Sequence, residues 1–117
     1  MPPSPTDRSY LADMRTYAVR LSGFLNGQTF GDFEPGSQLR MAVERGLEII
    51  DEAANRTSAS LRAEHPEIPW LDIIGQRNFI AHQYGDVLAH RIWHTATIRV
   101  PQLIAAIDAI IPPDEGE

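Results

Sequence analysis

The sequence predicts an all-α fold, an antiparallel bundle of four to five helices, and three observations support this prediction. Apolar residues recur every three or four positions in four separate segments of the chain. Short stretches rich in glycine, proline and polar residues separate these segments. No alternation of apolar and polar residues of the kind that marks a β-strand competes with the helical pattern.

The first two segments are expected to be long helices. The first runs from about Thr6 to Leu25, and Ser4 or Thr6 is a plausible N-cap. The second runs from about Ser37 to Glu64 with helical spacing of its apolar residues. The stretch 65–69 contains two prolines, which disfavour the α conformation in the residues before them, so we expect the second helix to end there.

The other two segments lie in the C-terminal half. The third is expected to begin at Pro69 and to continue to about Tyr84. Gly85 and the residue after it then offer a helix stop and a new cap. The fourth runs from 87 to 111, and Pro101 should kink it or divide it in two.

Length and composition favour a single domain. A chain of 117 residues with 43% hydrophobic content can bury a core without disulfides, and it contains no cysteine. We expect one domain over 1–117, with flexible tails at 1–5 and 112–117. No secretory signal pattern is present, and no stretch approaches the roughly 20 apolar residues of a membrane span. A cytoplasmic protein without a membrane contact is the expectation.

The charge balance argues against broad, non-specific adhesion to nucleic acid. The 10 basic residues, all of them arginine, are outnumbered by 16 acidic residues, which gives a formal net charge of -6. Non-specific binding of nucleic acid usually depends on a basic surface. A local arginine site is still compatible with this composition.

The third segment contains a cluster of polar residues. On an ideal helical wheel Arg77 lies at the centre of an apolar stripe, which is costly unless the guanidinium is paired or faces a cleft or an interface. Asn78 and His82 are four positions apart and lie together beside that stripe. One interpretation is structural: Arg77 pairs with an acid of the second segment, such as Glu48 or Asp51. The other is a functional site.

At these residues the sequence resembles a known family. The string Ile-Gly-Gln-Arg-Asn-Phe-Ile-Ala-His-Gln-Tyr-Gly-Asp-Val, over 74–87, is similar to the signature of the HepT-like branch of HEPN domains. In that signature an Arg-Asn pair precedes His-x-Tyr, with His five positions after Arg. Arg77, Asn78, His82 and Tyr84 all match it. Similarity also covers 47–56, 65–70 and 100–103, so that it extends over roughly 8–111.

The resemblance implies a HEPN-like helical dimer whose two motifs form one cleft, and a metal-independent endoribonuclease without a cofactor. Arg77 and His82 would be catalytic, and Asn78 would help to shape the site. Tyr84 would accept AMP from a partner, an MntA-like nucleotidyltransferase antitoxin. The expected partners are therefore this antitoxin, an RNA substrate and a second copy of the chain, and a larger hetero-oligomer is compatible with them.

These residue types suit the cleavage of RNA without a metal. A histidine titrates near neutral pH and can transfer a proton, and a forked, permanently charged arginine binds phosphate well. Arg77 and His82 are about 140° apart on an ideal helix, so one helix presents them awkwardly to a single phosphate. Only one histidine is present in each motif. A dimer interface that combines two motifs would ease both difficulties.

Other candidate sites are weaker. His90 and His94 are four apart but lack the glutamate of a zinc-protease motif, so we expect no metal site and place both histidines on the surface or near the motif. The acids Glu48, Asp51 and Glu52 are more typical of a solvated helix face, or of a partner for Arg77, than of a hydrolytic pair. No glycine-rich phosphate loop is present. The two tryptophans, Trp70 and Trp93, are expected to pack.

Two functions from different classes thus follow from the sequence. The leading hypothesis is the toxin of a two-gene HEPN/MNT toxin–antitoxin system. The alternative is a non-catalytic subunit that keeps the motif for nucleotide binding or for docking a nucleotidyltransferase. The intact arginine, histidine and tyrosine favour the first hypothesis, and the neighbouring gene would discriminate between them.

Overall fold

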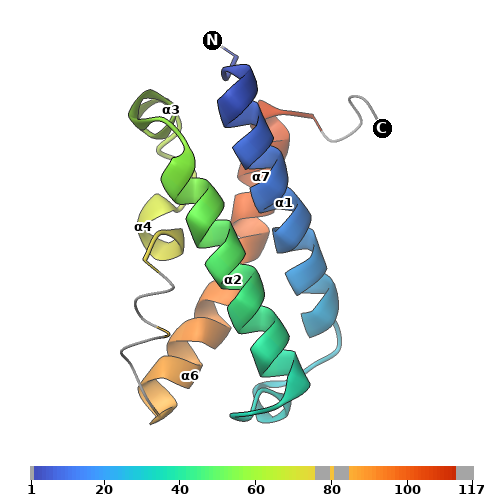
Figure 1. Cartoon of the computed structure of the whole chain (residues 1–117). Helices are drawn as coiled ribbons and strands as arrows, with labels where there is room; N and C mark the ends of the chain where they lie inside the picture. Colours follow the sequence, from blue (N-terminus) through green and yellow to red (C-terminus); the bar gives the residue numbers. More distant parts are fainter. Residues whose placement is uncertain (1, 76–79, 81–84, 113–117) are drawn as a thin grey trace.

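The expected helical bundle is confirmed. A computed structural model describes residues 2–75, 80 and 85–112 of the chain, and no strand occurs within them. The first long helix runs away from the N-terminus, the second returns beside it, α7 packs against α1, and α4 packs against α2 (Figure 1). The elements in chain order are α1 (Pro5–Leu25), η1 (Phe30–Asp32), α2 (Gln38–Arg56), α3 (Ala59–Glu64), α4 (Trp70–Ile73), α6 (Gly85–His94), η2 (Thr95–Arg99) and α7 (Val100–Ile110).

The start of α1 agrees with the sequence prediction. Ser4 is the N-cap, and its side chain accepts a hydrogen bond of 3.1 Å from the backbone N–H of Asp7. Pro5 occupies the first helical turn, where a missing N–H costs nothing. The buried residues of the helix, apart from Asp7, follow the expected spacing and are Leu11, Met14, Ala18, Leu21 and Leu25.

The prediction of one helix over 37–64 is wrong. Helix α2 ends at Arg56, and Thr57 and Ser58 both adopt extended backbone conformations before α3 begins. Ser58 caps α3 through its side chain and also binds Asp7: its N–H and its hydroxyl donate to the Asp7 carboxylate at 2.9 and 2.6 Å. A contact between residues 51 positions apart therefore accompanies the break, and local periodicity does not reveal it.

The prediction of one continuous helix from Pro69 to Tyr84 is also wrong. Pro69 is the N-cap of α4, which ends after one turn at Ile73. Ile74 has an extended backbone, and Gly75 has φ +102°, a conformation that favours glycine. Side-chain directions on an ideal helix therefore cannot be extrapolated from α4 past Gly75. The expected stripe centred on Arg77 assumed an unbroken helix from Trp70, and Arg77 itself lies outside the described residues.

The fourth segment is divided as expected, but the change begins before Pro101. Helix α6 starts at Gly85, so the residue after Gly85 lies within the helix and the expected new cap there is wrong; the expected end of the third helix lies outside the described residues. Residues 95–99 form a π-helical segment, η2, in which the Val100 N–H bonds to the carbonyl of Thr95. Proline has no N–H and its ring crowds the carbonyl four residues earlier, so a locally wider helix is one way to accommodate it.

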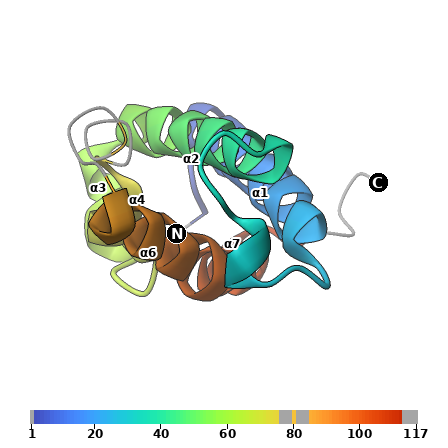
Figure 2. The same cartoon turned by 90° about the horizontal axis from the view of Figure 1, so that it is seen from below.

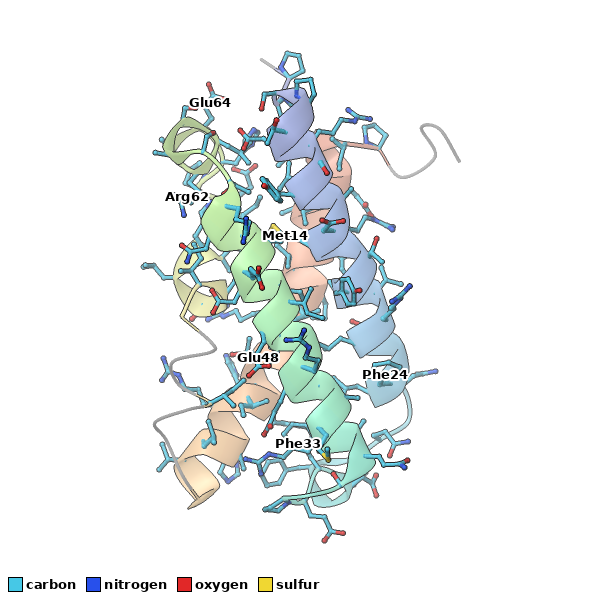
Figure 3. All side chains as sticks on the ribbon, in the orientation of Figure 1. Met14, Phe24, Phe33, Glu48, Arg62 and Glu64 are labelled. Atoms are coloured by element: carbon cyan, nitrogen blue, oxygen red, sulfur yellow. The ribbon has the colours of Figure 1, made fainter. Side chains whose placement is uncertain are left out.

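The core lies between α1, α2 and the C-terminal helices. Figure 2 shows α1 and α2 on one side of the bundle, with α6 and α7 on the other. Met14 of α1 is fully buried, and Phe33, 1% exposed, closes the end of the bundle where α2 begins (Figure 3). Within the described part of the chain, none of the helices combines the length and the apolar character needed to cross a membrane.

Candidate functional site

The four residues of the sequence motif lie outside the described residues. Arg77, Asn78, His82 and Tyr84 fall in 76–79 and 81–84, so their expected roles stay predictions. The structure does describe both flanks of the motif, which are the α4 turn that ends at Gly75 and the start of α6. These flanks define the surroundings in which the motif must act.

The upstream flank is attached to α2 by a buried carboxylate. Asp51 is 2% exposed and accepts a hydrogen bond of 3.1 Å from the backbone N–H of Gly75. Trp70 fixes the other end of α4, because its indole N–H donates to the carbonyl of His65 at 2.9 Å. The turn that leads into the motif is thus held at two points. Trp70 packs against the core, as the sequence predicted.

The downstream flank is α6, which buries one face and exposes the other. Leu88 and Ile92 lie in the core, whereas His90 and His94 are exposed. The His90 ring stacks on Phe30 with centroids 4.4 Å apart. The described residues contain no group of three histidine, cysteine or acidic side chains that could hold a metal ion. His90 is therefore seen as a surface residue in an aromatic contact.

Trp93 joins η1 to α6. Its ring meets Phe30 edge-on at 5.7 Å and Phe33 at 5.4 Å between centroids. The Phe33 ring also lies under the guanidinium of Arg40, 5.5 Å away. The packing role that the sequence predicted for Trp93 is confirmed, and the sequence did not indicate its partners.

Exposed apolar side chains lie on α4, on α6 and on η2. Leu71 of α4 is 95% exposed, Val87 of α6 is 69% exposed and Ile98 of η2 is 45% exposed. An ion pair of 3.0 Å between Asp72 and Arg99 joins α4 to η2, and Leu71 and Ile98 directly precede its two members. We call Leu71, Val87 and Ile98 the apolar face. Leu71 and Ile98 are thus on elements that the ion pair joins, Val87 lies near the start of α6, and the exposure of Leu71 makes it a candidate for burial by a partner.

The acids of α2 have different surroundings. Glu48 pairs with Arg45 at 3.7 Å and Glu52 pairs with Arg56 at 3.2 Å, both along the helix surface. Figure 3 shows Glu48 projecting from α2 on the side where α4 and α6 lie. Asp51 differs, since it is buried and contacts another element. A solvated face describes Glu48 and Glu52, and a pairing of any of these acids with Arg77 stays a prediction.

Sequence analysis did not find a groove between α1 and α2. Its cavity has a volume of about 480 Å³ and its walls include Tyr10, Tyr17, Arg45 and Arg56. Hydrogen bonds to Tyr10 and to Glu52 raise the pKa of the Arg56 guanidinium above its usual value. Tyr10 and Tyr17 are two helical turns apart on α1, which is the pattern that could have indicated this groove.

The sequence matches the Ribonuclease HepT-like family over residues 14–110, which is most of the chain. The protein belongs to this family. It is 28% identical over 110 residues to a Methanocaldococcus jannaschii protein named "Putative RNase MJ1216", covering 94% of this chain and 91% of the relative. It is 31% identical over 110 residues to "Putative RNase TTE0752" of Caldanaerobacter subterraneus, covering 94% and 98%.

A third relative carries the family name itself. The chain is 31% identical over 96 residues to "Probable ribonuclease HepT" of Thermococcus cleftensis, with 82% of this chain and 87% of the relative covered. No solved structure gives a significant match. The HepT-like match includes the whole motif from Arg77 to Tyr84, and the resemblance seen in the sequence is confirmed at the level of the family.

Proposed function

We propose that this HepT-like protein is an endoribonuclease toxin that acts as a dimer in the cytoplasm and is neutralised by a nucleotidyltransferase antitoxin. One observation carries the proposal: a chain that belongs to the Ribonuclease HepT-like family also has the complete motif of Arg77, Asn78, His82 and Tyr84. The three relatives have names that describe ribonucleases, which supports the same class of activity.

The proposed reaction uses no metal ion. A base removes the proton of a ribose 2′-hydroxyl, and the 2′-oxygen attacks the adjacent phosphorus. The bond from phosphorus to the 5′-oxygen of the next nucleotide then breaks, and that oxygen receives a proton, which leaves a 2′,3′-cyclic phosphate and a 5′-hydroxyl. His82 performs one of the two proton transfers, and Arg77 stabilises the negative charge that develops on the phosphoryl oxygens. Asn78 helps to shape the site.

The second proton transfer requires another group, and a dimer provides it. With two motifs in one cleft, the partner subunit's His82 can act opposite the first. The exposed side chains support this arrangement, because Leu71 lies on the element before the motif and Val87 on the element after it, and a symmetric contact could bury their apolar surface.

Control of the toxin is proposed to act at Tyr84. Transfer of AMP from ATP to the tyrosine hydroxyl forms a phosphodiester and releases pyrophosphate. The added group is negatively charged and bulky, and it lies two residues from His82, where the substrate phosphate must bind. Like-charge repulsion and steric blocking then act in the same direction. The transferase can also inhibit by binding, so that larger hetero-oligomers are compatible with this scheme.

Growth after expression tests this proposal. Cells that express the protein should stop growing, cells that express His82→Ala should grow, and co-expression of an MntA-like nucleotidyltransferase should restore growth to cells with the unaltered toxin. Circular dichroism of His82→Ala must show unchanged helical content. A fully toxic His82→Ala variant would contradict the catalytic assignment. Absence of toxicity together with tight binding to the transferase would instead support the non-catalytic docking subunit.

A further inference from the structure

We infer that Asp51 is a positioning residue: its carboxylate holds the Gly75 turn and thereby fixes where the chain enters the motif. The inference rests on the proposed ribonuclease function for its effect on the reaction. The contact itself is described by the structure, with 3.1 Å between the Gly75 nitrogen and Asp51 Oδ1. Gly75 is two residues before Arg77, so a displacement at Gly75 changes the start of the segment that carries the site.

The location of Asp51 is unusual for an acid. It is 2% exposed and lies on the buried stripe of α2, four residues after Leu47 and three before Ala54, which are 1% and 0% exposed. Its neighbours Glu48 and Glu52 are on the surface of the same helix and pair with arginines there. Burial of a carboxylate is costly unless it is hydrogen-bonded or paired. An apolar residue would suit this stripe better if packing were its only function.

The conformation at Gly75 explains what the carboxylate stabilises. Helix α4 stops after one turn, Ile74 is extended, and Gly75 has φ +102°, where side chains are strained. The described backbone hydrogen bonds include none from the Gly75 N–H, and a backbone donor away from water needs an acceptor. Asp51 supplies that acceptor from a rigid helix. Catalytic groups require such support, since a displacement of about 1 Å can lower a rate by roughly 100-fold.

The first experiment compares Asp51→Ala with Asp51→Asn and with Glu52→Ala, the matched control on the exposed face of the same helix. Asparagine keeps an oxygen that can accept from Gly75, and alanine does not. On an RNA substrate, Asp51→Ala should lower kcat by about 10- to 100-fold with KM within about twofold. Asp51→Asn should restore most of the lost kcat, and Glu52→Ala should equal the unaltered protein. Equal loss in Asp51→Asn and Asp51→Ala overturns the inference, since the acceptor oxygen would then be irrelevant.

The second experiment does not depend on cleavage. Amide hydrogen exchange at Gly75, followed by NMR, should be at least about tenfold faster in Asp51→Ala than in the unaltered protein. In Asp51→Asn the exchange rate should be close to that of the unaltered protein. Unchanged exchange in Asp51→Ala overturns the inference even if cleavage falls. If the protein cleaves no RNA while Gly75 is protected by Asp51, the proposed function fails and the anchoring contact stands.

A double-mutant cycle guards against a general loss of stability. Gly75→Ala has space for its methyl group, because no described atom beyond its two chain neighbours lies within 4 Å of the added carbon. The substitution strains the backbone at φ +102°, so it disturbs the same turn without changing Asp51. If Asp51 acts through this turn, the double variant should lose little more kcat than the worse single variant. If the double variant folds and its loss of kcat equals the product of the two single losses, the effects are independent and the inference is overturned.

Discussion

Replacement of Leu71 by aspartate should separate the subunits of the proposed dimer without unfolding the chain. Leu71 is 95% exposed in the isolated chain, so the change removes almost no packing within one subunit. Full burial of a leucine side chain contributes about 1.5 to 3 kcal/mol, and twofold symmetry buries two, which gives roughly 3 to 6 kcal/mol for the dimer. Since each 1.4 kcal/mol is a factor of ten, Kd should rise by about 100- to 10,000-fold.

Analytical ultracentrifugation over a range of concentrations measures this shift, and urea unfolding monitors the fold. Met41→Asp is the matched control, because Met41 is a 62% exposed apolar residue on α2, outside the apolar face. We expect the control to remain dimeric and both variants to keep their helical content. If Leu71→Asp dimerises as tightly as Met41→Asp, the apolar face is not the interface. If the unaltered protein is a monomer at micromolar concentration, catalysis by paired motifs is wrong.

Three further predictions follow from the structure and the motif. Asp7→Ala should lower the free energy of unfolding by about 2 to 4 kcal/mol, because it leaves two donors of Ser58 without their charged acceptor. Urea denaturation that shows a loss below about 1 kcal/mol would contradict this prediction. Tyr84→Phe should retain much of the RNase activity but gain no adenylate mass with catalytic transferase and ATP, and equal gains in both proteins refute the tyrosine assignment. Excess EDTA should leave RNA cleavage unchanged, whereas a loss that Mg²⁺ restores speaks against the metal-free reaction.

The sequence predicted those parts of the fold that depend on local signals. The apolar spacing of α1 is contained within one segment and was predicted correctly, and Ser4 is one of the two caps that the sequence offered. The division of the fourth segment was predicted from Pro101, although the backbone adapts by a π-helical segment before it. In both cases the residues that determine the structure are neighbours in the chain.

The predictions failed where distant residues decide the backbone. The end of α2 involves Asp7, which binds Ser58 across the bundle, and the end of α4 involves Asp51, which binds Gly75. Helical periodicity continues through both places, so only Ser58 as a possible cap and Gly75 as a possible stop could have indicated the breaks. The motif itself was identified from residue types and spacing, and its flanking supports needed the tertiary structure.

The most direct test of the central claim is cleavage of a labelled RNA by purified protein in EDTA, with His82→Ala and Arg77→Ala beside it. The unaltered protein should produce fragments that end in a 2′,3′-cyclic phosphate and a 5′-hydroxyl. Each variant should cleave at least about 100-fold more slowly, which is the usual contribution of a general acid or base or of a charge-stabilising group. Equal cleavage by the unaltered protein and folded His82→Ala would contradict the account.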